Sequence, residues 1–267
     1  MSENNGKILI GLGSGRSGTA SLTSLIDRQP GAICFHEMNP SNAVFSGNPQ
    51  PHLNAIREYQ ALLNGGETAR LSVDYSRPST VKTYERLQTM GPVKVIGDIA
   101  FYYLNYIEEL FQVAPACVAV CMKRDKASTV ASWLKKSSIG RWRSLWLADK
   151  LKSWITRMPF HTEYNFWQEH DGSRWMKDPV WDSCFPKFDA ASKKEAIEMY
   201  WDYYYLEADR LQRKYPDRFW IFDVGELSEP QGQKRILSLL GIPEEDMVIG
   251  EKVHLHQSGI KSGGVPG

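Results

Sequence analysis

The feature that most constrains the fold is a short apolar run that ends in glycines and leads into a helical pattern. Residues 7 to 12 read KILIGL and predict a buried strand, while apolar residues recur at helical spacing between Thr19 and Arg28. The turn that joins them, GSGRSG at residues 13 to 18, is rich in glycine. We therefore expect a strand, a tight glycine turn and a helix in direct succession.

The rest of the chain continues to alternate strand-like and helix-like segments. Strands are predicted at residues 32–35, 93–97, 116–122 and 219–222, and helices at 52–64, 79–90, 102–111, 125–136, 193–215 and 229–240. The segment 39–51 is rich in Pro, Asn, Ser and Gly and predicts a loop. This alternation is typical of a three-layer α/β fold with a mostly parallel sheet, in which ligands bind beyond the carboxyl ends of the strands.

The length of 267 residues fits a single domain over 1–267. Residues 137–190 lose clear periodicity and carry Trp, Pro, Gly and charge, so we expect a helical lid or insertion over the ligand site. The sequence gives no oligomeric state.

Composition bears on partners and compartment. The net charge of +1 gives no reason to expect a nucleic-acid partner. No apolar stretch is long enough to span a membrane, and the N-terminus does not read as a signal peptide. The spacing of the cysteines predicts neither a metal site nor a disulfide framework, which favours a reducing cytoplasm: Cys34, Cys117, Cys121 and Cys184.

The glycine turn predicts a cradle for a phosphate or sulfate group. Glycines bring backbone N–H groups close to an anion, and the helix that follows adds the positive end of its dipole. The expected cradle comprises Gly15, Arg16, Ser17, Gly18, Thr19, Ala20 and Ser21. The Lys-Ser/Thr pair of nucleoside triphosphate loops is missing, and Ala20 stands where a hydroxyl would hold Mg²⁺.

Other interpretations of this turn stay open. Gly13, Gly15 and Gly18 also satisfy the GxGxxG pattern of dinucleotide sites, with Glu37 as the acid that such sites require. A small-molecule or nucleoside kinase could use a related loop. The glycines could also serve only to form a tight turn.

A second anion grip is predicted after the strand at 116–122. Arg124 follows that strand, and Ser132 comes eight positions later (132 minus 124) in the next predicted helix. Eight helical residues span about 12 Å, so both side chains can reach one large ligand. The planar guanidinium of arginine suits a phosphate. Alternatively, Arg124 pairs with Asp125 or another acid.

These motifs together resemble the sulfotransferases that use 3'-phosphoadenylyl sulfate (PAPS). The resemblance rests on RSGTAS at 16–21 and on Arg124 and Ser132 at their spacing, and it extends to GDIAFYYLNYIEELF and to WIFDVGELSEP with RILSLLGIP. Golgi-type and bacterial members are closer than cytosolic drug-metabolising ones, since Arg16 replaces their lysine. The resemblance implies a P-loop NTPase-like sulfotransferase fold.

The same resemblance implies roles for these residues. The first loop would hold the 5'-phosphosulfate of PAPS, and Arg124 with Ser132 would hold the 3'-phosphate, leaving 3',5'-ADP (PAP) as product. Lys261, in IKSGG, would close over the 3'-phosphate, although a solvated tail residue is an alternative. Sulfuryl transfer is catalysed by positioning and charge, here by Arg16, and requires no metal.

An acceptor hydroxyl, or amine, needs a base, for which Glu37 is the first choice and His36 the alternative. Asp74 and Asp98 also follow strand-like runs, and with Glu37 they would make a negative pocket for a small polar, cationic acceptor. Both aspartates could instead be helix caps. A nucleotide-binding protein without turnover is the remaining alternative.

Overall fold

A computed structural model of the chain describes residues 6–43, 47–65, 71–137, 151, 154–155, 188 and 190–250. Its centre is a five-stranded sheet in the order β2-β3-β1-β4-β5, with every neighbouring pair parallel. The strands are β1 (Lys7–Leu12), β2 (Ala32–His36), β3 (Val95–Ile99), β4 (Val118–Lys123) and β5 (Phe219–Asp223). The predicted α/β class with a parallel central sheet is confirmed.

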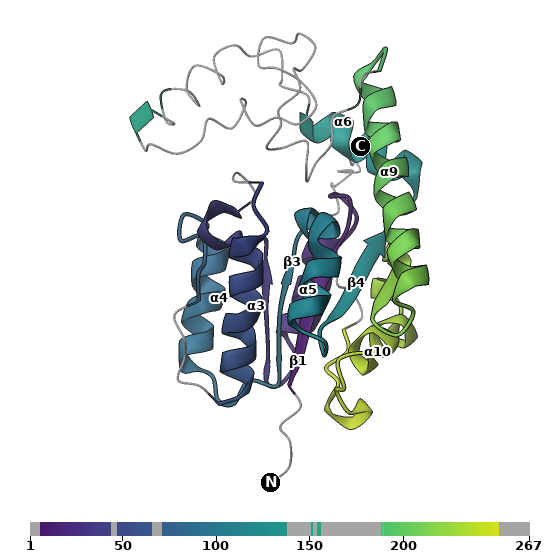
Figure 1. Cartoon of the computed structure of the whole chain (residues 1–267). Coiled ribbons are helices and arrows are strands. Elements are labelled where there is room, and N and C mark those ends of the chain that lie inside the picture. The colour runs from purple at the N-terminus through teal and green to yellow at the C-terminus, as the bar shows by residue number, and fades with distance from the viewer. Residues whose placement is uncertain are drawn as a thin grey trace, which may run out of the picture.

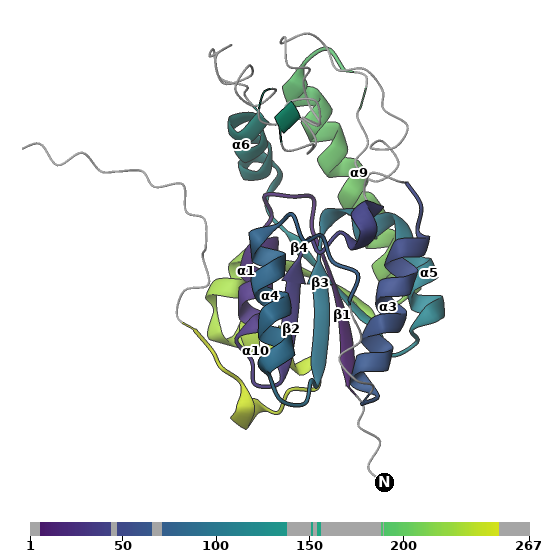
Figure 2. The same ribbon diagram turned by 90° about the vertical axis from the view of Figure 1, so that its left-hand side faces the viewer.

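Helices cover both faces of this sheet (Figure 1). The α-helices are α1 (Thr19–Asp27), α3 (Gln50–Leu63), α4 (Pro78–Thr89), α5 (Ile107–Val113), α6 (Lys126–Ser137), α9 (Lys193–Lys214) and α10 (Pro230–Ser238). Short 3-10 helices are η1 (Pro40–Asn42), η2 (Phe101–Tyr106), η3 (Val224–Ser228) and η4 (Glu244–Asp246). Figure 2 shows α1 and α10 on one side of the sheet, α3 and α5 on the other, and α4 along the β2 edge.

The core forms because successive strand residues point to opposite faces of the sheet. In β1, Ile8 and Ile10 pack into the apolar layer that includes buried residues of α3, α5 and α9, whereas Leu9 packs with residues of α1 and α10. In β4, Cys121 joins the first layer, as does the preceding Cys117. These two cysteines therefore pack into the same side of the core.

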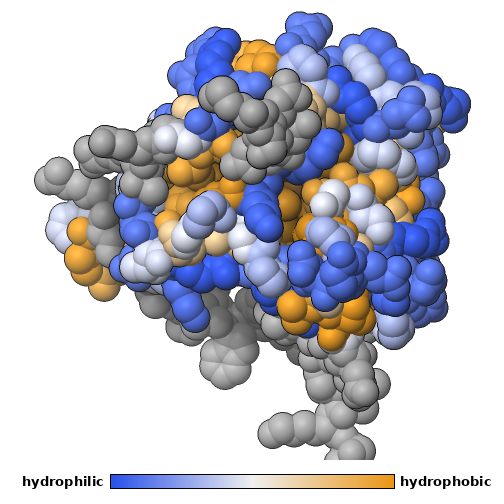
Figure 3. All heavy atoms as spheres, turned by 90° about the horizontal axis from the view of Figure 1, so that it is seen from below, coloured by the Kyte–Doolittle hydropathy of each residue, from blue (hydrophilic) through white to orange (hydrophobic). Residues whose placement is uncertain are grey.

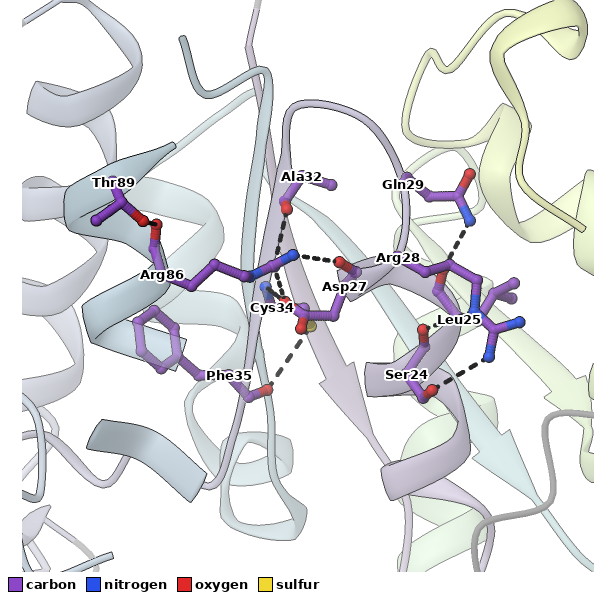
Figure 4. A network of polar contacts seen from close by, with 10 residues as sticks. All are labelled: Ser24, Leu25, Asp27, Arg28, Gln29, Ala32, Cys34, Phe35, Arg86 and Thr89. Carbon is purple, nitrogen blue, oxygen red and sulfur yellow. Dashed lines mark hydrogen bonds and ion pairs between the residues drawn. The ribbon is translucent and has the colours of Figure 1, made fainter. Parts of the chain in front are cut away.

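A polar network ties β2 to its flanking helices (Figure 4). The Asp27 carboxylate, at the end of α1, accepts the backbone N–H of Cys34 at 2.9 Å and pairs with the Arg86 guanidinium of α4. Arg86 also donates to the carbonyl oxygen of Ala32 at 3.1 Å. Burial raises the pKa of Asp27. This network fixes the beginning of β2 and therefore supports the strand whose far end carries the candidate base.

Two buried glutamines hold the last described segment. The side-chain amide of Gln29 exchanges hydrogen bonds with both backbone groups of Val248, at 2.8 and 2.9 Å. Gln233 does the same with Gly250, at 3.1 and 2.7 Å. Each glutamine amide thus forms the pair of hydrogen bonds that a neighbouring strand would form. This segment is therefore fixed beside α1 and α10 without joining the sheet.

Several predicted boundaries differ from those of the structure. Strand β3 starts and ends two residues later than predicted, because the buried Asp98 continues the strand while its carboxylate accepts backbone N–H groups. The single helix predicted at 102–111 is the 3-10 turn η2 followed by α5, and the backbone of Tyr106 (φ −121, ψ 5) separates them. Helix α3 begins at Gln50, inside the predicted loop. Most of the lid predicted at 137–190 lies outside the described residues.

The strands begin at the edge that Figure 3 views, and apolar and polar residues are interspersed there. A hollow on this edge is lined by residues at the starts of β1 and β3 and by the segment after α10, among them Lys7, Lys94 and Asp246. None of the predicted binding or catalytic residues lines it. The predicted anion-binding loops lie at the carboxyl ends of the strands, at the opposite edge.

Candidate functional site

The glycine turn forms a loop with unpaired backbone donors. In the part of the chain that the structure describes, the N–H groups from Gly15 to Ser21 have no hydrogen-bond acceptor. Helix α1 begins at Thr19 without a side-chain cap, so its first N–H groups point out of the helix unsatisfied. Such a set of donors at a helix N-terminus is a site for an anion. The predicted location of the cradle is where these donors lie.

The loop takes backbone conformations that favour glycine. Gly15 (φ 77) and Gly18 (φ 93) lie in the left-handed region. A Cβ at Gly15 would lie 2.5 Å from the ring of Trp133, and one at Gly18 would lie 2.6 Å from Val224. Both positions therefore need glycine for two reasons, the backbone angle and the close packing of a side chain against the loop.

Arg16 also adopts a left-handed conformation, with φ 59, which is uncommon for a residue with a Cβ. Its Nε donates to Ser132 Oγ on α6 at 2.9 Å. Its carbonyl oxygen accepts a bond from Arg124 Nη1 at 3.3 Å. Strained conformations persist where the surroundings over-determine them, and they cluster at functional sites. The two predicted grips, which were expected at opposite ends of a ligand, are in direct contact.

The position of these residues in the sheet has a topological reason. β1 lies between β3 and β4, and the chain leaves β1 toward β2 on one side but leaves β4 toward β5 on the other. The crevice between the carboxyl ends of β1 and β4 is therefore the switch point at which open α/β sheets bind ligands. Arg16 and Arg124 follow these two strands. The strand order also differs from the 3-2-1-4-5-6 order of dinucleotide-binding sheets.

Helix α9 holds the glycine loop through two tyrosines. The Tyr204 hydroxyl accepts the N–H of Gly13 at 3.1 Å, and the Tyr205 hydroxyl lies 3.2 Å from Ser14 Oγ. Tyr205 also donates to the carbonyl oxygen of Met122 in β4, at 2.8 Å. Burial raises the pKa of both tyrosines, so they remain protonated donors.

Tryptophans provide a corresponding contact at each of the two loops. Trp201 of α9 donates from Nε1 to the carbonyl oxygen of Arg124 at 3.1 Å, and Trp133 of α6 donates to the carbonyl oxygen of Ser14 at 3.3 Å. These four aromatic residues were not among the site residues predicted from the sequence. The spacing of Trp201, Tyr204 and Tyr205, at positions i, i+3 and i+4, was a usable sign that they share one helix face.

The two candidate bases at the end of β2 point to different partners. His36 Nε2 lies 3.2 Å from Thr19 Oγ1, in the first turn of α1, so this side chain reaches the cradle. Glu37 Oε2 lies 2.6 Å from Arg77 Nη2. Burial lowers the pKa of Arg77, but the attraction and hydrogen bond of Glu37 outweigh it and raise the pKa overall. Both side chains of the pair are about one-third exposed (34% and 28%), so a ligand can approach them.

Two aspartates predicted to bind the acceptor have other roles. Asp98 is fully buried (0% exposed), and its carboxylate is occupied by backbone N–H groups and by the Tyr103 hydroxyl. The prediction that Asp98 binds an acceptor is therefore wrong in this structure. Asp74 accepts bonds from the N–H and hydroxyl of Ser76, so it stabilises the turn before α4. Because Arg77 neutralises Glu37, the expected negative pocket is not formed.

Of the other predicted site residues, the structure describes some and leaves Lys261 outside the described part. Ser17 and Ser21 are buried in the loop and the first turn of α1, whereas Ala20 is partly exposed beside them. Lys261 lies outside the described residues, so its predicted part in the site stays a prediction.

The described residues bring together no group of three His, Cys, Asp or Glu side chains that could hold a metal ion. Within the same part of the chain, no helix has the length and apolar character needed to cross a membrane.

Comparisons with known proteins add little to this geometry. No protein-family model matches the chain, and no curated protein sequence does. The structure is similar to the crystal structure of a sulfotransferase from Alicyclobacillus acidocaldarius, at 14% sequence identity and a TM-score of 0.45, covering 93% of this chain and 85% of that chain.

Proposed function

We propose that this chain is a sulfotransferase that binds PAPS and transfers its sulfuryl group to a hydroxyl, or an amine, of a small acceptor. One observation carries the proposal. The unpaired N–H groups of the glycine loop meet the guanidinium groups of Arg16 and Arg124, together with Ser132, at the switch point of the sheet. A ligand with two separate anionic groups matches this combination of donors.

The backbone donors suit the 5'-phosphosulfate of PAPS. They carry no net charge, but they are fixed in direction and aided by the α1 dipole, so they stabilise charge without needing to reorganise. Arg16 adds a full positive charge on the same loop. The loop lacks the Lys-Ser/Thr pair with which nucleoside triphosphate sites hold the phosphates and Mg²⁺, since Thr19 and Ala20 stand there.

Arg124 and Ser132 would bind the 3'-phosphate. Ser132 accepts a bond from Arg16, and a phosphate could replace that bond because charge-assisted bonds to a guanidinium are stronger. The Ser132 hydroxyl would then be available as a donor to the same phosphate. On this proposal, nucleotide binding separates Arg16 from Ser132 and places an anion between them.

The transfer step is an in-line displacement at sulfur. The acceptor oxygen forms a bond to sulfur while the bond from sulfur to the 5'-phosphate oxygen breaks, and PAP leaves with that oxygen and its negative charge. The acceptor proton passes to a protein base. Charge builds up on the leaving oxygen, next to the loop N–H groups and Arg16, where it would be stabilised.

For the base, the contact between His36 and Thr19 favours His36 over Glu37. A neutral imidazole beside the cradle can take a proton near neutral pH. Glu37 is held by Arg77, which stabilises its charged form and fixes its direction. We propose that the Glu37–Arg77 pair borders the space for the acceptor, with both an acidic and a basic group available to bind it.

The test begins with binding of the product nucleotide. Thermal-shift and calorimetric titrations with PAP, ATP and NAD should show selective stabilisation by PAP, because a ligand that binds the native state raises its stability. Transfer of labelled sulfate from PAPS to a panel of neutral, anionic and cationic alcohols then tests turnover. Binding of ATP with Mg²⁺ in preference to PAP would favour a kinase, and PAP binding without any turnover would favour a binding protein.

A further inference from the structure

The turn after β2, residues 37 to 39, has each of its backbone donors held by one neighbouring segment. The N–H of Glu37 donates to the carbonyl oxygen of Ile99 at 3.0 Å. The N–H of Asn39 donates to the hydroxyl of Tyr102 at 3.0 Å. The N–H of the residue between them, Met38, donates to a carboxylate of the same segment. All three acceptors lie between residues 98 and 102, at the end of β3 and the start of η2.

That carboxylate belongs to Asp98. The N–H of Met38 lies 3.0 Å from Oδ1 and 3.1 Å from Oδ2, so it points between the two oxygens. Oδ1 also accepts the N–H of Ile99 at 2.9 Å, and Oδ2 accepts the Tyr103 hydroxyl at 2.6 Å. A fully buried carboxylate is costly unless it is well hydrogen-bonded, and this one is. The Asp98 carboxylate and the backbone of the turn therefore stabilise each other.

The turn itself is strained. Glu37 has φ 55 and Asn39 has φ 46, both in the left-handed region that residues with a Cβ seldom adopt. Such conformations persist only where the surrounding structure imposes them. Among the hydrogen bonds that hold this turn, those from the Met38 N–H to Asp98 have a charged acceptor and are therefore the strongest.

We propose that Asp98 is a positioning residue whose negative charge holds the strained turn and thereby sets the directions of the His36 and Glu37 side chains. The effect on catalysis rests on the proposed function, whereas the effect on the turn does not. Asp98 reaches no substrate in this arrangement, and it acts through the backbone of Met38. Asp98, which was first predicted to bind the acceptor, is instead buried and contacts the turn that carries Glu37.

The charge of Asp98 depends on pH in an accessible range. Burial raises its pKa to about 6, while the bonds from Tyr103, Met38 and Ile99 oppose this shift and nearby Glu37 adds to it. Protonation would replace a charged acceptor with a weaker neutral one and would loosen the turn. The ionisable groups around Asp98 come from β2 and the turn after it, from α3, from the residue before α4 and from η2: Cys34, Glu37, His52, Tyr59, Arg77, Tyr102 and Tyr103.

The direct test is NMR spectroscopy of the free protein, with three variants. In the wild type, the amide resonance of Met38 should shift between pH 5 and 7 with one midpoint. Asp98→Asn should abolish this shift and increase amide exchange at Met38 and Asn39 by tenfold or more. Tyr103→Phe removes a bond that lowers the pKa of Asp98, so the midpoint should move to higher pH.

Asp27→Asn is the matched control, because Asp27 is a partly buried carboxylate that also holds a backbone N–H of β2 (Figure 4). It should leave the Met38 titration unchanged. A Met38 resonance that does not titrate in the wild type, or that titrates unchanged in Asp98→Asn, would overturn the proposal. A titration midpoint that stays fixed in Tyr103→Phe would also count against it, because the group that titrates would then not be the carboxylate that this hydroxyl binds.

Kinetics with PAPS supply the second readout. Asp98→Asn should lower kcat about 10- to 100-fold, since small misplacements of reacting groups have effects of this size, while PAP affinity stays within about twofold. Equal kcat in Asp98→Asn and wild type would overturn the positioning role. If the wild type fails to bind PAP, the proposed function is lost, but the NMR titration still decides whether Asp98 holds the turn.

Discussion

Replacing Arg124 by alanine should weaken the binding of PAP much more than the binding of AMP. The two nucleotides differ only in the 3'-phosphate, which we assign to Arg124 and Ser132. The guanidinium of Arg124 carries five N–H donors, and the structure shows one of them bonded to the carbonyl oxygen of Arg16, at 3.3 Å. The remaining donors can serve a phosphate, and the substitution removes them all.

The size of the effect follows from these bonds. A hydrogen bond to a charged group contributes about 1.5–3 kcal/mol, which corresponds to a loss of about 10- to 150-fold in affinity for PAP. The bond to Arg16 is lost for both nucleotides, and at about 0.5–1.5 kcal/mol it should weaken each by up to about tenfold. The ratio of the two dissociation constants therefore isolates the contribution of the 3'-phosphate.

Isothermal titration calorimetry of PAP and AMP, at one fixed ionic strength, measures this ratio. Arg124→Lys keeps the charge but loses the planar fork, so it should fall between wild type and Arg124→Ala. Arg28→Ala, at the far end of α1, is the control for loss of an arginine, since Arg28 bonds only to the preceding helical turn among the described residues. Equal losses for PAP and AMP in Arg124→Ala would refute the assignment of the 3'-phosphate.

Further predictions concern the loop, the base and stability. Gly15→Ala should abolish measurable PAP binding and lower the free energy of unfolding by about 1–3 kcal/mol, because the new methyl group would overlap the indole of Trp133. Thermal unfolding measures this loss of stability. His36→Ala should lower kcat about 10²- to 10³-fold with PAP affinity retained, and a larger loss in Glu37→Gln would reverse the assignment of the base. Arg86→Met should lower the free energy of unfolding in urea by about 1–3 kcal/mol and leave kcat unchanged. A fall in kcat would mean that the contacts of Arg86 with Asp27 and β2 also affect the site. Between pH about 4 and about 6, folded Asp98 holds a proton that the unfolded chain has released, so stability should fall by up to about 3 kcal/mol as pH rises across this window. Asp98→Asn should flatten that slope in urea unfolding, and an unchanged slope would contradict the raised pKa.

The order of strands and helices was predictable because it depends on local patterns. Apolar runs such as those at β1 and β4 identify buried parallel strands, and the glycines at 13 to 18 identify the turn before α1. The same patterns misplaced β3 because an aspartate normally ends an apolar run. Asp98 stays inside the strand only because N–H groups from another part of the chain bind it, and no local pattern contains that information.

The candidate site could be predicted as a set of residues but not in its contacts. Residue type and position after a strand made Arg16, Arg124 and Ser132 candidates, yet the sequence could not show that Arg16 and Ser132 touch. It also assigned Asp98 to the acceptor, since burial cannot be read from position alone. Trp201, Tyr204 and Tyr205 were missed because their contacts join residues that are far apart in the chain, such as the 191 positions between Gly13 and Tyr204.

The aromatic face of α9 couples the two loops that we propose bind the nucleotide. One helix is hydrogen-bonded to the backbone of both loops, so a shift of that helix displaces both of them. On the proposed function, we therefore expect substitutions at these rings to weaken the binding of both ends of the nucleotide together, while the acceptor side can vary independently.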